Sequence, residues 1–194
     1  MEDINIYGRP NTLKPYRCQV CNYVYLGFKS PDHCPHCGAE QSVMVRYYKY
    51  VDIPKNARNI QADGVRDRNM EEMIRKAVQL ESHSEAVYRN IADNTDDVMI
   101  ESYFRRFARH EETHKDKAAE LLGITVTGLP EIRMEDYDIN TIFSKLVELE
   151  NETIEHYQNI INNSNIFQVR YFFKHLMEVE INHRHTGNNI LEQL

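Results

Sequence analysis

The chain has 194 residues, a formal net charge of −7 and 27% charged residues. Because it is acidic and has no block of basic residues, we do not expect a nucleic-acid partner. No apolar run approaches the ~18 residues of a membrane-spanning helix, and the first residues lack the basic-then-apolar pattern of a signal peptide. We therefore expect a cytoplasmic protein without a membrane segment.

The N-terminal part of the chain reads as a small module followed by a linker. Residues 1–17 form a polar lead-in, residues 18–47 contain every cysteine, and residues 48–64 form a linker that ends near Asp63-Gly64. Within residues 18–47 we expect short strands, with turns at Ser30-Pro31-Asp32 and at Gly38. A module of this size buries too little apolar surface to be stable alone, so it needs a metal or another crosslink.

The four cysteines form two Cys-x-x-Cys pairs. Cys18 and Cys21 make the first pair, and Cys34 and Cys37 make the second. Two such turns supply four thiolates to one tetrahedral metal ion. Disulfides fit less well, because two intervening residues strain a bridge and the expected compartment is reducing. Iron and zinc both accept four thiolates, so the residues alone leave the metal open.

Residues 65–194 have the apolar periodicity of four amphipathic helices, predicted at about 66–93, 97–122, 139–162 and 166–192. The first and second helices, and the third and fourth, are joined by short polar turns. Gly123 ends the second helix, and Asp138 can cap the third. Between them, residues 124–137 form a longer connection. The order of short, long and short connections predicts a mainly α, ferritin-like four-helix bundle with one long crossover.

The two halves of this region share a set of polar residues at a constant offset of 69 positions (150 − 81 and 183 − 114). Each residue lies on the apolar stripe of its helix, so the set is expected to face the core. The first half contributes Glu81, Tyr88, Glu111 and His114, and the second half contributes Glu150, Tyr157, Glu180 and His183.

Four glutamates and two histidines on apolar stripes predict a di-metal site. Buried carboxylates need a compensating cation, and no lysine or arginine lies on the same stripes. One glutamate from each of two helices and a Glu-x-x-His from each of the other two is the ligand pattern of di-metal carboxylate bundles. Iron or manganese suits such ligands and leaves positions open for an oxygen species. Tyr88 and Tyr157 either hydrogen-bond a ligand carboxylate or only fill the core.

The remaining histidines of the bundle fall off the apolar stripes. We expect them on solvated helix faces, with no part in metal binding. They are His83, His110, His156, His175 and His185.

These residues give nearly the whole chain a resemblance to a known family. The segments LESHSEAVY, RHEETH, LENETIEHY and EVEINHRH resemble the ligand segments of ferritin-like di-iron proteins, and CQVC and CPHCG resemble the knuckles of a rubredoxin module. Together they resemble rubrerythrins in which the rubredoxin comes first, the reverse-rubrerythrin arrangement. The resemblance implies one iron at the four cysteines, and a di-iron centre at Glu81, Glu111, His114, Glu150, Glu180 and His183.

The resemblance also implies a function. Similar proteins are non-haem iron peroxidases that reduce hydrogen peroxide to water, with the rubredoxin iron as an electron relay loaded by an external reductase. Similar proteins also form head-to-tail homodimers. Thr153 departs from the family, because rubrerythrins carry a further glutamate there. Two alternatives therefore stay open: an oxygen-consuming ferroxidase or oxidase, and a metal-storage or metal-binding protein whose cysteine module is a structural zinc ribbon.

Overall fold

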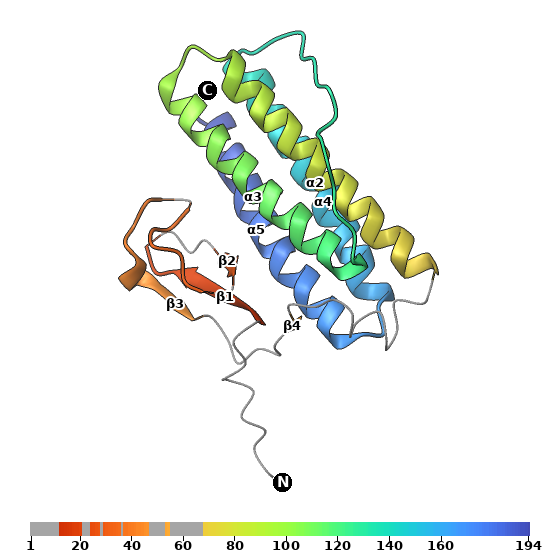
Figure 1. The fold of residues 1–194 in the computed structure, drawn as a ribbon. Helices are drawn as coiled ribbons and strands as arrows, with labels where there is room; N and C mark the ends of the chain where they lie inside the picture. Colours follow the sequence, from red (N-terminus) through yellow and green to blue (C-terminus); the bar gives the residue numbers. More distant parts are fainter. Residues whose placement is uncertain (1–11, 21–23, 28, 36, 47–52, 55–67) are drawn as a thin grey trace.

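The computed structural model describes residues 12–20, 24–27, 29–35, 37–46, 53–54 and 68–194. Its larger part is a bundle of four long helices, as predicted (Figure 1). They are α2 (Arg68–Asn94), α3 (Val98–Leu122), α4 (Ile139–Asn163) and α5 (Phe167–Leu191). Helices α2 and α3 form one hairpin, α4 and α5 form the other, and the segment between Leu122 and Ile139 crosses from one hairpin to the other.

Capping residues set the ends of the central helices. Asp97 accepts hydrogen bonds from the backbone N–H groups of Met99 and Ile100 at the start of α3. Asp138 does the same for Asn140 and Thr141 at the start of α4. Such caps satisfy backbone donors that have no partner within the helix. Gly123 ends α3 with a φ of 65°, a conformation that a residue without a side chain adopts at little cost.

The predicted apolar stripes form the interior of the bundle. Nearly all of their residues are buried, with Ile100 and Ile190 partly exposed. Ile139 is an exception to the prediction, since 40% of its surface is exposed. Ile139 is the first residue of α4. A helical side chain packs over the turn that precedes it, and since α4 has no turn before Ile139, this side chain stays exposed.

The apolar core is divided into two clusters along the bundle axis. One cluster contains Ile74, Ala118, Ile160 and Phe173, and the other contains residues such as Phe104 and Leu146. On α2, α3 and α4 the repeated glutamates fall between the segments that contribute to the two clusters. The polar residues are therefore enclosed by apolar packing at both ends.

A small antiparallel sheet precedes the bundle. Strand β1 (Thr12–Cys18) pairs with β2 (Val24–Gly27) on one side and β3 (Met44–Arg46) on the other, and its first residues pair with β4 (Ile53–Pro54). A 3₁₀ turn, η2 (Gln41–Val43), leads into β3. Strand β1 begins inside the segment predicted as a lead-in, and β4 lies inside the predicted linker. Both depend on hydrogen bonds to partners distant in sequence, which local composition does not reveal.

The sheet module packs against the bundle at α5. Val179 of α5 forms one apolar cluster with Cys18, Cys34 and Met44. Strand β2 also contacts α5, and Figure 1 shows the sheet lying along this side of the bundle. The cysteine module therefore contacts α5 at Val179, which precedes Glu180 in the sequence.

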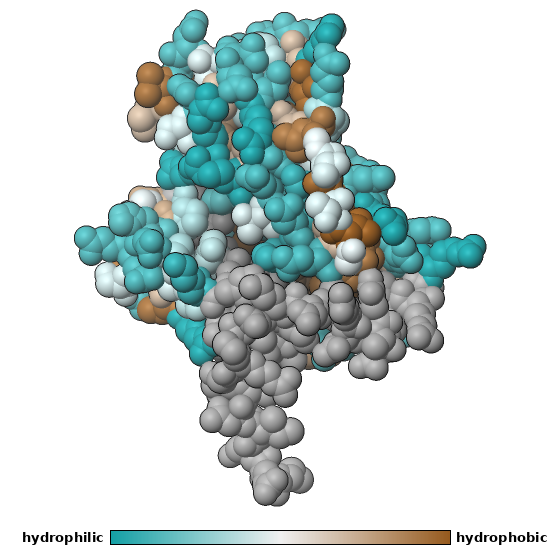
Figure 2. Space-filling model, viewed as in Figure 1, coloured by the Kyte–Doolittle hydropathy of each residue, from teal (hydrophilic) through white to brown (hydrophobic). Residues whose placement is uncertain are grey.

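The outer surface of the bundle is mostly hydrophilic on the face drawn in Figure 2, with hydrophobic residues in small separate groups. No helix in the described part of the chain combines the length and the apolarity that crossing a bilayer requires.

Gly187 allows α4 and α5 to approach closely, and this contact can be tested. A Cβ atom at Gly187 would lie 2.7 Å from Leu146 Cδ2 and 2.8 Å from Val147 Cγ2. Overpacking of this kind costs about 1–3 kcal/mol, against a helix-propensity gain of roughly 1 kcal/mol for alanine. We expect Gly187→Ala to lower the free energy of unfolding of the metal-free protein by about 1 kcal/mol in denaturant titrations.

The matched control is Asn189→Ala, an exposed position in the same turn of α5. Here the better helix propensity of alanine should leave stability unchanged or slightly higher. A Gly187→Ala protein that is as stable as the control would contradict the close approach of the two helices.

Candidate metal centres

All six predicted metal ligands lie in the interior of the bundle. Glu81 comes from α2 and Glu150 from α4, and the two Glu-x-x-His pairs come from α3 and α5. Residues three apart on a helix share a face, which brings each histidine beside its own glutamate. None of the six residues is more than 4% exposed, so their polar atoms depend on neighbouring groups inside the protein for contacts. The six are Glu81, Glu111, His114, Glu150, Glu180 and His183.

These residues form two overlapping groups, each able to hold one metal ion. In each group the ligand atoms lie within 4.8 Å of one another. Glu111 and Glu180 belong to both groups, so each could bridge two metals through its two oxygens. The first group is Glu81, Glu111, His114 and Glu180, and the second is Glu111, Glu150, Glu180 and His183.

Both histidines present the Nδ1 atom to the carboxylates. His114 Nδ1 lies 2.7 Å from Glu180 Oε1 and 3.5 Å from Glu111 Oε2. His183 Nδ1 lies 3.0 Å from Glu180 Oε2 and 3.2 Å from Glu111 Oε1. The two imidazoles therefore approach the shared glutamates from opposite halves of the duplicated sequence.

The site fits a pair of metal ions better than a set of hydrogen bonds. Buried polar atoms normally have hydrogen-bond partners, yet six atoms here have none of suitable geometry. They are Glu81 Oε2, Glu111 Oε1, His114 Nδ1, both carboxylate oxygens of Glu180, and His183 Nδ1. Among the residues that the structure describes, the one buried lysine or arginine is Lys115, which lies 2.6 Å from Glu85 Oε2. Carboxylate and imidazole ligands of this kind suit iron or another transition metal.

The carboxylates strongly perturb one another when no metal is present. Burial, together with repulsion from Glu180 and Glu111, raises the pKa of both Glu81 and Glu150 well above the usual range. Burial would also raise the pKa of Glu111, but its close contacts with the imidazoles of His114 and His183 hold it well below that range. Although burial opposes it, the carboxylates raise the pKa of both histidines. In the metal-free protein, bound protons therefore supply part of the positive charge that the buried carboxylates need.

Each buried tyrosine donates a hydrogen bond to a glutamate from the opposite half of the bundle. Tyr88 Oη lies 2.5 Å from Glu150 Oε1, and Tyr157 donates to Glu81 Oε1. Burial and the nearby carboxylates raise the pKa of both phenols well above its usual value, so they stay protonated donors. These contacts match the first of the two roles considered for the tyrosines. The two tyrosines therefore orient Glu81 and Glu150, the glutamates that are not shared between the two groups.

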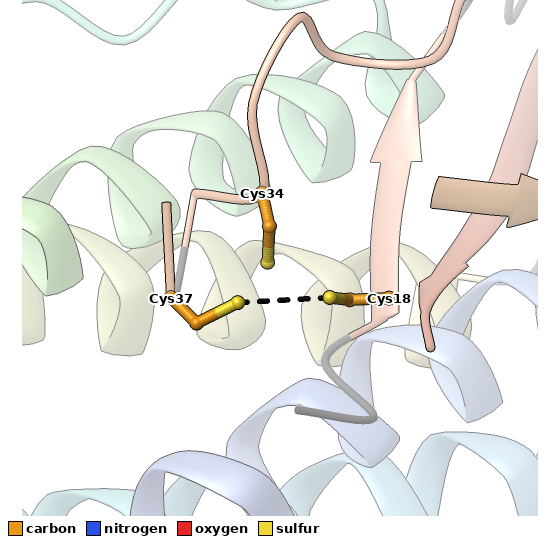
Figure 3. A group of neighbouring side chains, drawn as sticks. All are labelled: Cys18, Cys34 and Cys37. Carbon is orange, nitrogen blue, oxygen red and sulfur yellow. Dashed lines mark hydrogen bonds between the residues drawn. The ribbon is translucent and has the colours of Figure 1, made fainter. Parts of the chain in front are cut away.

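Three of the four cysteines converge in the sheet module (Figure 3). Cys18 ends β1, and Cys34 and Cys37 lie on the turn whose tight geometry comes from Gly38. Cys18 Sγ lies 3.6 Å from Cys37 Sγ, much longer than a disulfide bond. Thiolates around one tetrahedral ion lie ~3.8 Å apart, given metal–sulfur bonds of about 2.3 Å. The arrangement therefore suits a bound metal. Cys21 lies outside the described residues.

Two of the histidines expected on solvated faces are buried, so that expectation was wrong for them. His110 is 5% exposed and its Nδ1 lies 3.0 Å from His183 Nε2. His175 is 2% exposed and its ring lies against Tyr171, with centroids 4.4 Å apart. Both lie beside the stripe positions, where a neighbouring helix or the sheet module can cover them. His185 is exposed as expected, and His83 and His156 are half-buried.

Sequence reasoning also missed a buried ion pair between α2 and α3. Glu85 and Lys115 each lie four residues after a proposed ligand, and Arg89 adds a second contact to Glu85 at 2.8 Å. The i,i+4 spacing from Glu81 and from Glu111 was the available signal. Thr153, which occupies the position of the additional family glutamate, is buried on α4.

The perturbed carboxylates make the stability of the metal-free protein depend on pH. Groups whose folded pKa is raised bind protons that the unfolded chain releases, so their stabilising contribution is lost as pH rises. Glu81 and Glu150, with an ordinary value of 4.5, and His114 and His183, with 6.5, act in this direction. Glu111, whose pKa is depressed, acts in the opposite direction: its stabilising contribution is present above its ordinary value of 4.5 and is lost as pH falls below it.

We therefore expect the free energy of unfolding of the metal-free protein to fall as pH rises above 4.5, the ordinary pKa of the two glutamates, by up to about 1.4 kcal/mol per pH unit for each proton retained. The double substitution Glu81→Gln and Glu150→Gln should flatten this dependence, because amides need no proton to remain buried. Replacing two exposed glutamates of the same helices, Glu72 and Glu155, with glutamine is the control. Equal slopes in both double variants would show that these carboxylates are solvated.

Comparisons with known proteins agree with this arrangement. Residues 16–44 match the family model of the rubrerythrin rubredoxin-like domain. Reverse rubrerythrin-1 of Clostridium acetobutylicum is 32% identical over 119 residues, which cover 59% of this chain and 65% of that protein. The chain thus spans just under two thirds of the relative's length. No solved structure matches. The chain therefore has a rubredoxin-like module before a four-helix bundle, and it is similar to a reverse rubrerythrin.

Proposed function

We propose that this protein is a non-haem di-iron peroxidase that reduces hydrogen peroxide to water. The observation that carries the proposal is the pair of buried four-ligand groups that share Glu111 and Glu180. When bound and reduced, the two metals would supply two electrons to hydrogen peroxide and polarise its O–O bond. Each peroxide also consumes two protons and yields two water molecules.

The residues of the chain would position the metals and keep bulk water away from them. Glu81 and Glu150 would each serve one metal, and hydrogen bonds from Tyr157 and Tyr88 fix their orientation. The apolar clusters on both sides exclude bulk water, which strengthens electrostatic interactions inside the site.

We propose that the four cysteines hold one iron that passes electrons to the di-iron centre, and that an external reductase loads it. The packing of Cys18 and Cys34 against Val179 supports a route within one chain, because Glu180 is the next residue. This differs from the expected head-to-tail dimer, in which the partner chain would bring the two centres together. Dimerisation itself stays a proposal.

A second candidate is an oxygen-consuming ferroxidase or oxidase, and Thr153 favours it. This residue is buried on the same helix as Glu150, at the position where similar proteins have a further carboxylate. The hydroxyl group of Thr153 cannot replace a carboxylate as an anionic ligand, so the six named residues would have to hold the metals without a seventh carboxylate. Comparing peroxide and oxygen consumption by the reduced protein distinguishes the two activities.

The shared glutamates provide the most direct test of the metal centre. We expect Glu111→Ala and Glu180→Ala each to reduce the metal bound by the bundle and to lower peroxide consumption to background, because each removes a ligand common to both groups. Metal content by elemental analysis and a peroxide assay measure this. Glu112→Ala changes an exposed neighbour of Glu111 and should retain both properties. Full activity in both ligand variants would refute the proposed site.

The proposed electron relay through the cysteine site is tested by removing one of its cysteines. Cys34→Ser should remove the metal of the sheet module and the thiolate-to-iron charge-transfer absorption that it produces. The bundle should stay helical, as measured by circular dichroism. A colourless wild-type protein with zinc at this site would instead support a structural zinc ribbon.

The route of the electrons is tested by co-expressing Cys34→Ser chains with Glu111→Ala chains. Transfer within one chain predicts that the mixture stays inactive, because neither chain carries both centres. Analytical ultracentrifugation first establishes that the two variants associate as the wild type does. Recovered peroxide consumption in mixed oligomers would show that electrons cross between chains.

A further inference from the structure

Two buried imidazoles from different helices meet beside the proposed di-iron centre. His110 in α3 and His183 in α5 have nearly parallel rings, with an angle of 12° between the planes and centroids 5.2 Å apart. Phe107 lies against the His183 ring at a centroid distance of 4.3 Å. The His183 ring is therefore fixed by neighbours, although His110 occupies a position that the apolar pattern assigned to solvent.

The two nitrogens of His183 face different partners. Nδ1 points to the shared glutamates, 3.0 Å from Glu180 Oε2 and 3.2 Å from Glu111 Oε1. Nε2 points away from them and lies 3.0 Å from His110 Nδ1. A neutral imidazole that binds metal through one nitrogen carries its proton on the other. His183 would then donate its Nε2–H to His110 Nδ1, which acts as the acceptor.

The duplication does not repeat this contact. The position equivalent to His110 in the second half is Val179 (110 + 69). Valine has no atom that accepts a hydrogen bond, and Val179 packs against Cys18 and Cys34 instead. The imidazole pair therefore belongs to one half of the centre, the half that contains Glu150 and His183.

We propose that His110 is a positioning residue for His183: it fixes the tautomer and ring orientation of this ligand and so strengthens metal binding by one of the two groups. The affected group is Glu111, Glu150, Glu180 and His183. The general reason is that a hydrogen bond to the outer nitrogen of a ligating histidine orients the ring and raises its basicity. The inference rests on the proposed di-metal function of these residues.

The test is a Co²⁺ titration of the full-length protein, followed by visible absorption. Thiolate-bound Co²⁺ has intense charge-transfer bands, so the cysteine site is distinguished from the carboxylate sites. His110→Phe keeps an aromatic ring but has no hydrogen-bond acceptor. We expect it to lower the affinity for one of the two carboxylate-bound Co²⁺ ions by about 10–100-fold. His110→Gln, whose amide oxygen can accept the same hydrogen bond, should restore most of the affinity.

Measurements on metal-free protein separate positioning from a purely structural role. The positioning role predicts that His110→Phe leaves thermal unfolding of the metal-free protein close to that of wild type. If this variant does not fold, His110→Leu replaces it with a smaller apolar side chain. Unchanged affinity for both carboxylate-bound ions in the folded variant would overturn the proposal, as would a His110→Gln protein that binds as weakly as His110→Phe.

A double-mutant cycle assigns the effect to one group. In a Glu81→Ala background, which impairs the other group, His110→Phe should still weaken binding. In a Glu150→Ala background it should have little further effect, because the group it supports is already impaired. The reverse pattern would overturn the assignment. If wild-type protein took up no Co²⁺ at the carboxylates, the di-metal function itself would be refuted, which is a distinct result.

Discussion

Desolvation of charge is the constraint on which this structure depends. Four carboxylates and two imidazoles lie within an apolar bundle, and the buried lysine among the described residues is bound to Glu85, outside their cluster. Isolated buried charges of this kind are too costly to persist, so protons or metal ions must compensate them. The helices, their short turns and their apolar clusters hold the six groups close enough to share two ions.

The duplicated sequence explains much of this geometry. Each half supplies one glutamate, one tyrosine and one Glu-x-x-His pair, and each tyrosine hydrogen-bonds the glutamate of the opposite half. The two halves are therefore interdependent, since each glutamate accepts its tyrosine hydrogen bond from the other half. This arrangement provides two similar groups of candidate ligands that have Glu111 and Glu180 in common.

The symmetry is incomplete on α3 and α5, and the differences have chemical consequences. At the equivalent positions, His110 contacts His183, whereas Val179 contacts the cysteine module. His183 thus has an additional polar contact, whereas Val179, at the position equivalent to His110, packs against the cysteine module. If the proposed relay operates, electrons would enter on the side of Val179, and His110 would support a ligand on the other side.

The sequence by itself determined the four helices, the crossover and the six buried polar residues, because apolar periodicity and ligand spacing are local properties of a helix. It also indicated the cysteine site, since each Cys-x-x-Cys pair is a single turn. Only the tertiary structure decided that His110 and His175 are buried, that β1 extends back to Thr12, and that the cysteine module packs at Val179. These features depend on which surfaces meet between segments distant in the chain, and no local pattern encodes that information.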